Sequence, residues 1–249
     1  MRAERARSDI RVHAALVTAL VGFVGWVVLA IFAVALGAVV TNLVVGHALG
    51  DGDIDVARWF VDQRTDTWNT LSLVGSHVAD TVTVIVIAAI TLLVLGVRRA
   101  WPQFALLTVA MACEGATYLV ATYFVSRNRP PVPRLESLIQ TDSYPSGHTA
   151  AAVALYGCLC IIVWSLTDDR IWRAVFFAVA VLAPVVVAAS RMYRGMHFAS
   201  DVVAGLLIGA GCIAVGYVAS RAGFAAAGQR HDDRDDDSPL LTLAHPVAS

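Results

Sequence analysis

The most restrictive feature of this sequence is a long stretch without charge near its start. Residues 12–50 contain no Asp, Glu, Lys or Arg, and Ala15–Val40 within them is almost wholly apolar. Such a run is typical of a helix that crosses a bilayer, because a helix satisfies its backbone polar groups internally. More runs follow, and 58% of the 249 residues are hydrophobic whereas 15% are charged. This composition excludes an ordinary soluble domain and predicts a polytopic membrane protein.

Six apolar runs predict an all-α fold, a bundle of six transmembrane helices. They cover Ala15–Val40, about Leu71–Val97, about Gln103–Val125, about Pro145–Leu166, about Ala174–Ser190 and Phe198–Ser220. The first run is longer than the core of a cleavable signal peptide, so we expect a retained span. Residues 1–14 would form an Arg-rich tail, residues 15–220 the membrane domain, and residues 221–249 a disordered acidic tail.

The basic residues predict the orientation of the bundle. All 18 are arginines; 11 lie on the side of the termini and seven on the other side of the six predicted spans. Arginine accumulates on the cytoplasmic side, so we expect a multi-pass protein of the plasma (inner) membrane with both termini in the cytoplasm. The loops after the third and fifth spans then face outside. A formal net charge of −1 argues against a nucleic-acid partner.

Cysteines and acids inside the apolar runs have simpler interpretations. All four cysteines lie within these runs, where buried thiols are expected instead of disulfides or metal ligands. Asp80 interrupts the second run, and Glu114 lies near the middle of the third. Intramembrane acids usually face the bundle interior, and we expect structural hydrogen bonds for both.

Three polar segments at the outward ends of the spans carry most of the reactive side chains. They are Arg127–Pro130, Tyr144–His148 and Ser190–Asp201. In the third segment, His197 and Asp201 are four residues apart at the start of the last predicted span, so they would share one helical face. Asp201 could then hold the imidazole and leave its other nitrogen free as a nucleophile. The alternative is that the pair only caps the helix.

The second segment favours an anion site. Pro145 suits the first turn of a helix, and Ser146 and Gly147 would leave backbone N–H groups open at its positive end, beside His148 as a possible acid. Ordinary helix capping is the alternative. Arg129 and Arg191 add permanently charged donors that match phosphate oxygens, although interfacial arginines also bind lipid headgroups.

Together the three segments resemble the signature of the type-2 phosphatidic acid phosphatase superfamily. The matching features are Arg129-Pro130, Pro145-Ser-Gly-His148, and Ser190-Arg191 followed by His197 and Asp201. The resemblance covers the chain except its two tails. It implies that His197 attacks phosphorus to form a phosphohistidine, that Asp201 orients it, and that His148 protonates the leaving oxygen. It also implies that no metal or other cofactor takes part and that the phosphoryl oxygens are bound by Arg129, Arg191, Ser146 and Gly147.

One position departs from the family pattern. The first motif usually opens with a Lys seven residues before the Arg of Arg-Pro, and this chain has Thr122 there and no Lys anywhere. A neutral hydroxyl would weaken one phosphate contact. Arg127 could supply the missing charge as a phosphate-binding residue, or it could be a plain loop arginine.

The sequence therefore predicts an integral membrane phosphatase with its active site at the extracytoplasmic edge. Its partners would be the bilayer and a lipid phosphate or diphosphate that loses its terminal phosphate, such as a polyprenyl diphosphate or a phosphatidic-acid-like lipid. Two alternatives stay open. A phosphotransferase of the same superfamily would use an alcohol instead of water, and a non-catalytic binder or transporter of lipid phosphates would not need His197.

Overall fold

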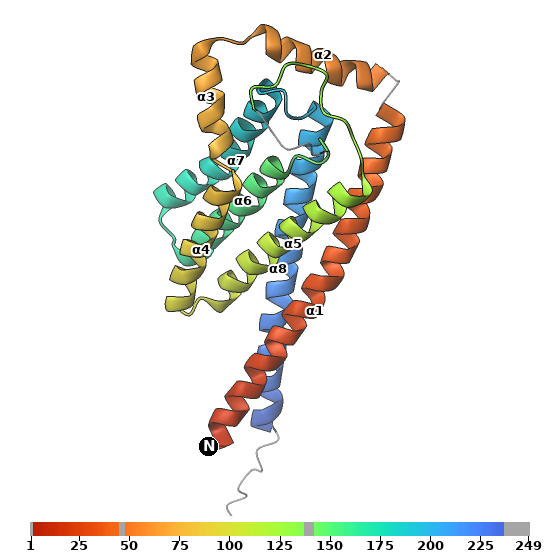
Figure 1. Ribbon diagram of the computed structural model, residues 1–249. Coiled ribbons are helices and arrows are strands. Elements are labelled where there is room, and N and C mark those ends of the chain that lie inside the picture. The colour runs from red at the N-terminus through yellow and green to blue at the C-terminus, as the bar shows by residue number, and fades with distance from the viewer. Residues whose placement is uncertain (1, 45–47, 137–141, 237–249) are drawn as a thin grey trace, which may run out of the picture.

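The computed structural model describes residues 2–44, 48–136 and 142–236, which form helices and no strand (Figure 1). The elements in chain order are α1 Arg2–Val39, η1 Val40–Val44, α2 Ala48–Asp62, α3 Asp66–His77, α4 Thr81–Val97, α5 Trp101–Phe124, α6 Gly147–Leu166, α7 Arg170–Tyr193 and α8 Ala199–Asp236. The four cysteines are free thiols within these helices, as expected.

The predicted bundle of six spans is confirmed. Six segments are long and apolar enough to cross a membrane: Asp9–Asn42, Asp66–Val97, Trp101–Phe124, Gly147–Leu166, Arg170–Tyr193 and Ala199–Gly228. The second crossing consists of two helices, because α3 ends at His77 and Asp80 begins α4 as its N-cap. Its carboxylate accepts the Thr83 N–H at 2.8 Å and so caps the start of α4.

A helix without a counterpart among the six predicted spans lies across one end of the bundle. Figure 1 shows α2 running across the tops of the other helices, with α3 descending from it. We call this end of the molecule the α2 end. Asp53 on α2 is buried, whereas Trp59 is largely exposed, and Trp68 at the start of α3 is equally exposed. Amphipathic aromatic side chains of this kind are typical of the membrane–water boundary.

The first and last helices extend beyond the predicted membrane domain. Helix α8 continues to Asp236, so residues 221–236 are helical where the sequence predicts disorder, and residues 237–249 lie outside the described residues. Helix α1 already begins at Arg2. The two helices pack closely: a Cβ added at Gly223 would lie 1.9 Å from the Thr18 hydroxyl, and one at Gly25 would lie 2.9 Å from Val215. This packing stabilises the adjoining turns of the two helices.

The positions of α6 and α8 depend on two glycines that bring their backbones together. A Cβ at Gly205 would lie 2.6 Å from the Ser146 carbonyl oxygen, and one at Gly209 equally near the Ala150 carbonyl oxygen. No larger residue fits at either place. The close approach holds the first turns of α6 and α8 side by side at the α2 end, and both turns carry residues of the sequence motifs.

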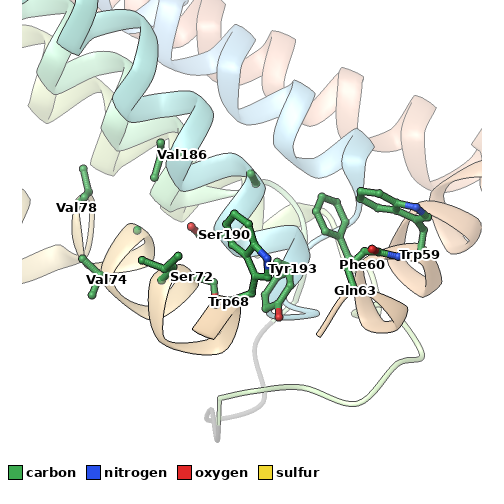
Figure 2. Close-up of a pocket in the computed structure, with 13 residues that line it drawn as sticks. Trp59, Phe60, Gln63, Trp68, Ser72, Val74, Val78, Val186, Ser190 and Tyr193 are labelled. Atoms are coloured by element: carbon green, nitrogen blue, oxygen red, sulfur yellow. The ribbon is translucent and has the colours of Figure 1, made fainter. Parts of the chain in front are cut away.

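An apolar pocket of about 640 Å³ lies between α2, α3 and α7. Figure 2 shows that Trp59, Phe60, Trp68 and Tyr193 contribute aromatic rings to it, with Ser72 and Ser190 among the few polar side chains. Helix α3 separates this pocket from a second, more polar cavity that receives the motif residues.

Candidate active site

The motif segments meet at a cavity of about 850 Å³ between α3, α4, α5, α6 and α7. Five of the eight predicted site residues line it: Arg129, Gly147, His148, Arg191 and His197. The other three, Arg127, Ser146 and Asp201, do not. Most polar residues of the cavity come from the α2 end of the bundle, and Glu114, near the middle of α5, also lines it. Apolar residues continue along α4 and α5, including Val84, Ile85, Ala88, Met111 and Leu119.

His197 is held in one tautomer by the backbone. Its Nδ1 atom lies 2.7 Å from the Ser143 carbonyl oxygen, in the loop before α6. Because a carbonyl oxygen only accepts, Nδ1 carries the proton and Nε2 keeps a free lone pair. Burial, followed by the positive charges of Arg191 and Arg129, holds the pKa of His197 well below its usual range. The imidazole is therefore neutral at pH 7, which is the nucleophilic form.

Asp201 plays a different part from the expected one. Helix α8 begins at Ala199, so His197 lies before the helix and the two residues do not share a helical face. The Asp201 Oδ2 atom is 3.9 Å from Nδ1 of His197, too far for a hydrogen bond, and it accepts the Phe198 N–H at 2.9 Å. The carboxylate thus shapes the turn that presents His197, while the Ser143 carbonyl orients the ring.

Arg127 is not placed on the phosphate site. Its guanidinium pairs with Asp201, donates to Asp53 at 2.9 Å and to the Ser200 hydroxyl at 2.8 Å, and lies over the Phe198 ring at 4.3 Å. The side chain is buried and does not line the cavity. The expectation that Arg127 substitutes for the missing lysine is therefore wrong in this structure, because two carboxyl groups already occupy its donors.

Thr122 is also turned away from the cavity. Its hydroxyl donates to the carbonyl oxygens of Tyr118 at 2.9 Å and Leu119 at 3.1 Å, within its own helix. Neither Thr122 nor Arg127 supplies a donor to the cavity. Among the described residues that line it, the permanently charged cations are Arg129 and Arg191.

At the start of α6, only one of the two residues predicted to bind the anion lines the cavity. The Ser146 N–H donates to the Asp201 carbonyl oxygen at 3.2 Å, and its hydroxyl pairs with the Thr149 hydroxyl at 2.9 Å. Ser146 is fully buried outside the cavity, so the expectation that it binds phosphate is wrong in this structure. Gly147 does line the cavity, at a helix start whose first N–H groups lack intrahelical partners. The Tyr118 ring would lie 2.9 Å from a Cβ there, so only glycine fits.

His148 lies on the first turn of α6 and faces the cavity. Within the described part of the chain no hydrogen bond or ion pair holds its ring, so both nitrogens are available for proton transfer. His148 and His197 line the same cavity, as an acid and a nucleophile of one reaction require.

Arg191 and Arg194 share a carboxylate that the sequence analysis did not identify. Arg191 Nη1 donates to Glu136 Oε1 at 3.0 Å and Oε2 at 3.1 Å, and to the Ser76 hydroxyl at 2.7 Å. Arg194 Nε donates to Glu136 Oε1. Glu136 also lines the cavity. Glu136 is the one glutamate in the loop that joins two of the motif segments, so the sequence could have indicated it as a partner for the site arginines.

Arg129 completes the cationic wall. Its Nη1 atom donates to the Met196 carbonyl oxygen, next to His197. Burial and then the neighbouring charge of Arg191 lower the pKa of Arg129, but a guanidinium starts so far above neutral that it stays charged. The Met196 contact places this charge beside the nucleophile.

Several further residues of the site had no recognisable sequence signal. The imidazole of His77 lies 2.7 Å from the Asp80 carboxylate at the turn between α3 and α4, and both side chains line the cavity. Tyr118 on α5, Ser76 on α3 and Ser143 in the loop before α6 reach the site through the packing of separate segments. No group of three or more His, Cys, Asp or Glu among the described residues is arranged to hold a metal ion.

Comparison with known proteins identifies the family. The model of the PAP2 superfamily matches residues 103–224, a range that contains the three motif segments. This part of the chain belongs to the PAP2 superfamily. No curated protein sequence matches the chain.

Two solved structures resemble this protein. One is a transmembrane PAP2-type phosphatidylglycerolphosphate phosphatase from Bacillus subtilis, with a TM-score of 0.58, 21% identity, and coverage of 83% of this chain and 96% of the other. The second is LpxE from Aquifex aeolicus, with a TM-score of 0.52, 22% identity, and coverage of 67% and 93%. At these identities the likeness shows a shared fold, that of transmembrane PAP2 phosphatases.

Proposed function

We propose that this PAP2 protein hydrolyses the terminal phosphate of a lipid phosphate or diphosphate through a phosphohistidine intermediate. The observation that carries the proposal is the contact between Nδ1 of His197 and the Ser143 carbonyl, 2.7 Å long. It leaves the Nε2 lone pair free in a cavity that also holds two guanidinium groups and a second imidazole. Those are the groups that in-line attack on phosphorus requires.

The proposed reaction has two steps. The Nε2 atom of His197 forms a bond to phosphorus while the bond to the leaving oxygen breaks, and protonated His148 gives its proton to that oxygen. Neutral His148 then takes a proton from water, whose oxygen attacks phosphorus and breaks the P–N bond. Phosphate leaves, and His197 returns to its neutral form with the Nδ1–H still donating to the Ser143 carbonyl oxygen.

The arginines stabilise the charge that develops on the transferring phosphoryl group. Arg129 and Arg191 offer planar arrays of N–H donors that remain charged at any physiological pH. Such donors contribute most when they are fixed before the reaction in a site that excludes water. Both guanidinium groups are fixed, by the Met196 carbonyl for Arg129 and by the Ser76 hydroxyl for Arg191.

The apolar part of the cavity supports a lipid substrate. Val84, Ile85 and Ala88 of α4 face Met111 and Leu119 of α5 along this part. Ile85 and Leu119 are also exposed on the outside of the bundle, where the surrounding lipid would lie. An acyl or isoprenoid chain in this groove would place its phosphate at the polar end, beside the two histidines.

We further propose that the cavity opens on the outer side of the plasma membrane and that both termini lie in the cytoplasm. The excess of arginine on the terminal side supports this orientation. A reporter protein that fluoresces only in the cytoplasm, fused at the C-terminal end, would fluoresce in the proposed orientation. A fusion that is expressed but does not fluoresce would show the opposite orientation.

The central test measures phosphate release by the purified full chain in detergent. The substrates are a polyprenyl diphosphate and phosphatidic acid, EDTA is present throughout, and His197→Ala is compared with wild type. We expect wild type to release phosphate and to carry an acid-labile label from a ³²P-labelled substrate, and the variant to do neither. Release that survives in His197→Ala would refute the mechanism, and label transferred to an added alcohol would indicate a phosphotransferase.

A further inference from the structure

One of the two proposed phosphate-binding arginines, Arg191, already binds an anion that belongs to the chain itself. We propose that the Glu136 carboxylate, which Arg194 also holds, occupies the phosphoryl position on Arg191 in the substrate-free protein and is displaced by a dianionic phosphate monoester or a terminal diphosphate. This inference rests on the proposed function, because it names how that same site selects its substrate. The class it excludes is the phosphodiester, the headgroup linkage of bulk membrane phospholipids.

The contact geometry is that of a replaceable anion. Both oxygens of Glu136 approach the same atom, Nη1 of Arg191, at 3.0 and 3.1 Å. This is not the parallel two-donor arrangement in which guanidinium binds carboxylate most strongly. The Nε atom of Arg191 is buried without a hydrogen-bond partner among the described residues. A phosphoryl group has three oxygens in place of two, so it can use donors that the carboxylate leaves unused.

The charges of the cluster favour a dianion over a monoanion. Two guanidinium groups, those of Arg191 and Arg194, share the single carboxylate of Glu136. A phosphate monoester carries between −1.5 and −2 at pH 7, whereas a diester carries a single charge. A diester would exchange one monoanion for another and would gain little, whereas a monoester adds charge that the arginines can neutralise.

Glu136 is ionised and able to leave. Burial raises the pKa of its carboxyl group. The charges of Arg191 and Arg194 and their hydrogen bonds lower this pKa by more than burial raises it, so the pKa lies below the usual range. Its side chain is 21% exposed and lies on a loop, not within a helix. A move into the cavity opening would therefore return the carboxylate to water without disturbing a helix. The need to displace Glu136 lowers the apparent affinity for phosphate, because only molecules in which the carboxylate has left the site can bind it.

The test compares binding of inorganic phosphate and of a phosphodiester to the full chain in detergent. All proteins carry His197→Ala so that no turnover occurs, and titration calorimetry measures phosphate, phosphatidic acid and phosphatidylglycerol. Glu136→Gln keeps the shape of the side chain and removes its charge. We expect phosphate to bind this variant about tenfold more tightly and phosphatidylglycerol to bind measurably. The control Asp55→Asn breaks an exposed acid–arginine pair on α2, with Arg58, and should change neither affinity.

Each outcome decides the proposal. Weaker or unchanged phosphate binding in Glu136→Gln, or no binding to any variant, would overturn it. Glu136→Ala is a second variant that removes the carboxylate without introducing glutamine. Its melting temperature shows whether it is folded, and it should bind phosphate at least as tightly as the protein that retains Glu136. If hydrolysis by the wild-type chain depends on His197 and yet Glu136→Gln changes nothing, the proposed function stands and this inference fails. If the wild-type chain hydrolyses nothing, the proposed function itself fails.

Discussion

Two arginine clusters at the α2 end differ in their ratio of positive to negative charge. In the first, Arg127 alone contacts two carboxyl groups, Asp53 and Asp201, and all three side chains are buried away from the cavity. In the second, Arg191 and Arg194 share the single carboxylate of Glu136 at the cavity wall. The comparison teaches that an arginine whose charge is neutralised by neighbouring carboxylates stabilises the fold. Arginines that outnumber their carboxylates keep positive charge that can bind an anionic ligand.

Removal of Arg127 is the strongest test of this comparison. Arg127→Ala leaves Asp53 and Asp201 buried without a counter-charge, and loss of one partner from a buried ion pair costs about 3–5 kcal/mol. We expect a large drop in the melting temperature of the detergent-solubilised protein and loss of activity with it. Unchanged melting would show that the cluster is not structural.

Removal of Arg191 should separate function from stability. Arg191→Ala is expected to lower kcat/KM about 10²–10³-fold, the effect of losing one fixed donor to a transition-state oxygen. Melting should change little, because this variant leaves Glu136 paired with Arg194. Steady-state phosphate release measured beside thermal melting provides both readouts. An equal fall of stability and activity would remove the distinction between the two clusters.

The two arginines that line the cavity should also control the acid side of the pH profile. Positive charge from Arg191 and Arg129 adds to burial in holding the pKa of His197 low. Protonated imidazole cannot attack, so activity falls when the pH drops through that pKa. Arg129→Gln removes one opposing charge and raises the pKa, so the acid limb of kcat/KM should move to higher pH. A limb that stays in place would mean that His197 does not set it.

A smaller effect is expected from the loop that joins the two clusters. The Tyr144 hydroxyl donates to the Ala33 carbonyl oxygen at 2.8 Å, and a Cβ added at Gly37 would lie 2.6 Å from the Tyr144 ring. Gly37→Ala should shift the loop and the neighbouring Ser143 carbonyl. We expect a cost of about 1–3 kcal/mol in stability and a modest loss of activity.

The matched control is Gly52→Ala on α2, where nothing lies within 4 Å of an added Cβ. It should leave activity unchanged and melting unchanged or slightly higher, since alanine favours helix over glycine. If Gly37→Ala behaves in the same way, Tyr144 does not transmit its position to Ser143.

Much of the fold was predictable because its signal is local. Apolar runs of membrane length identified all six crossings, and the three motif segments predicted the cavity residues His148, Arg129 and Arg191. The prediction for Asp201 failed because α8 begins two residues after His197, a boundary that periodicity does not resolve. Arg127 was misassigned because its partner Asp53 lies 74 residues away on a helix outside the six predicted spans. Partners this far apart in the sequence show no characteristic spacing from which their contact could be predicted.

Helices α1 and α8 contain 38 residues each, which corresponds to about 57 Å at 1.5 Å per residue. This is nearly twice the roughly 30 Å of a bilayer's hydrocarbon core. Figure 1 shows their far ends projecting together past the other helices, at the end opposite the cavity. Fluorophores attached to the ends of this projecting pair would lie far from the cavity, so the pair offers a place to observe the protein without obstructing the site.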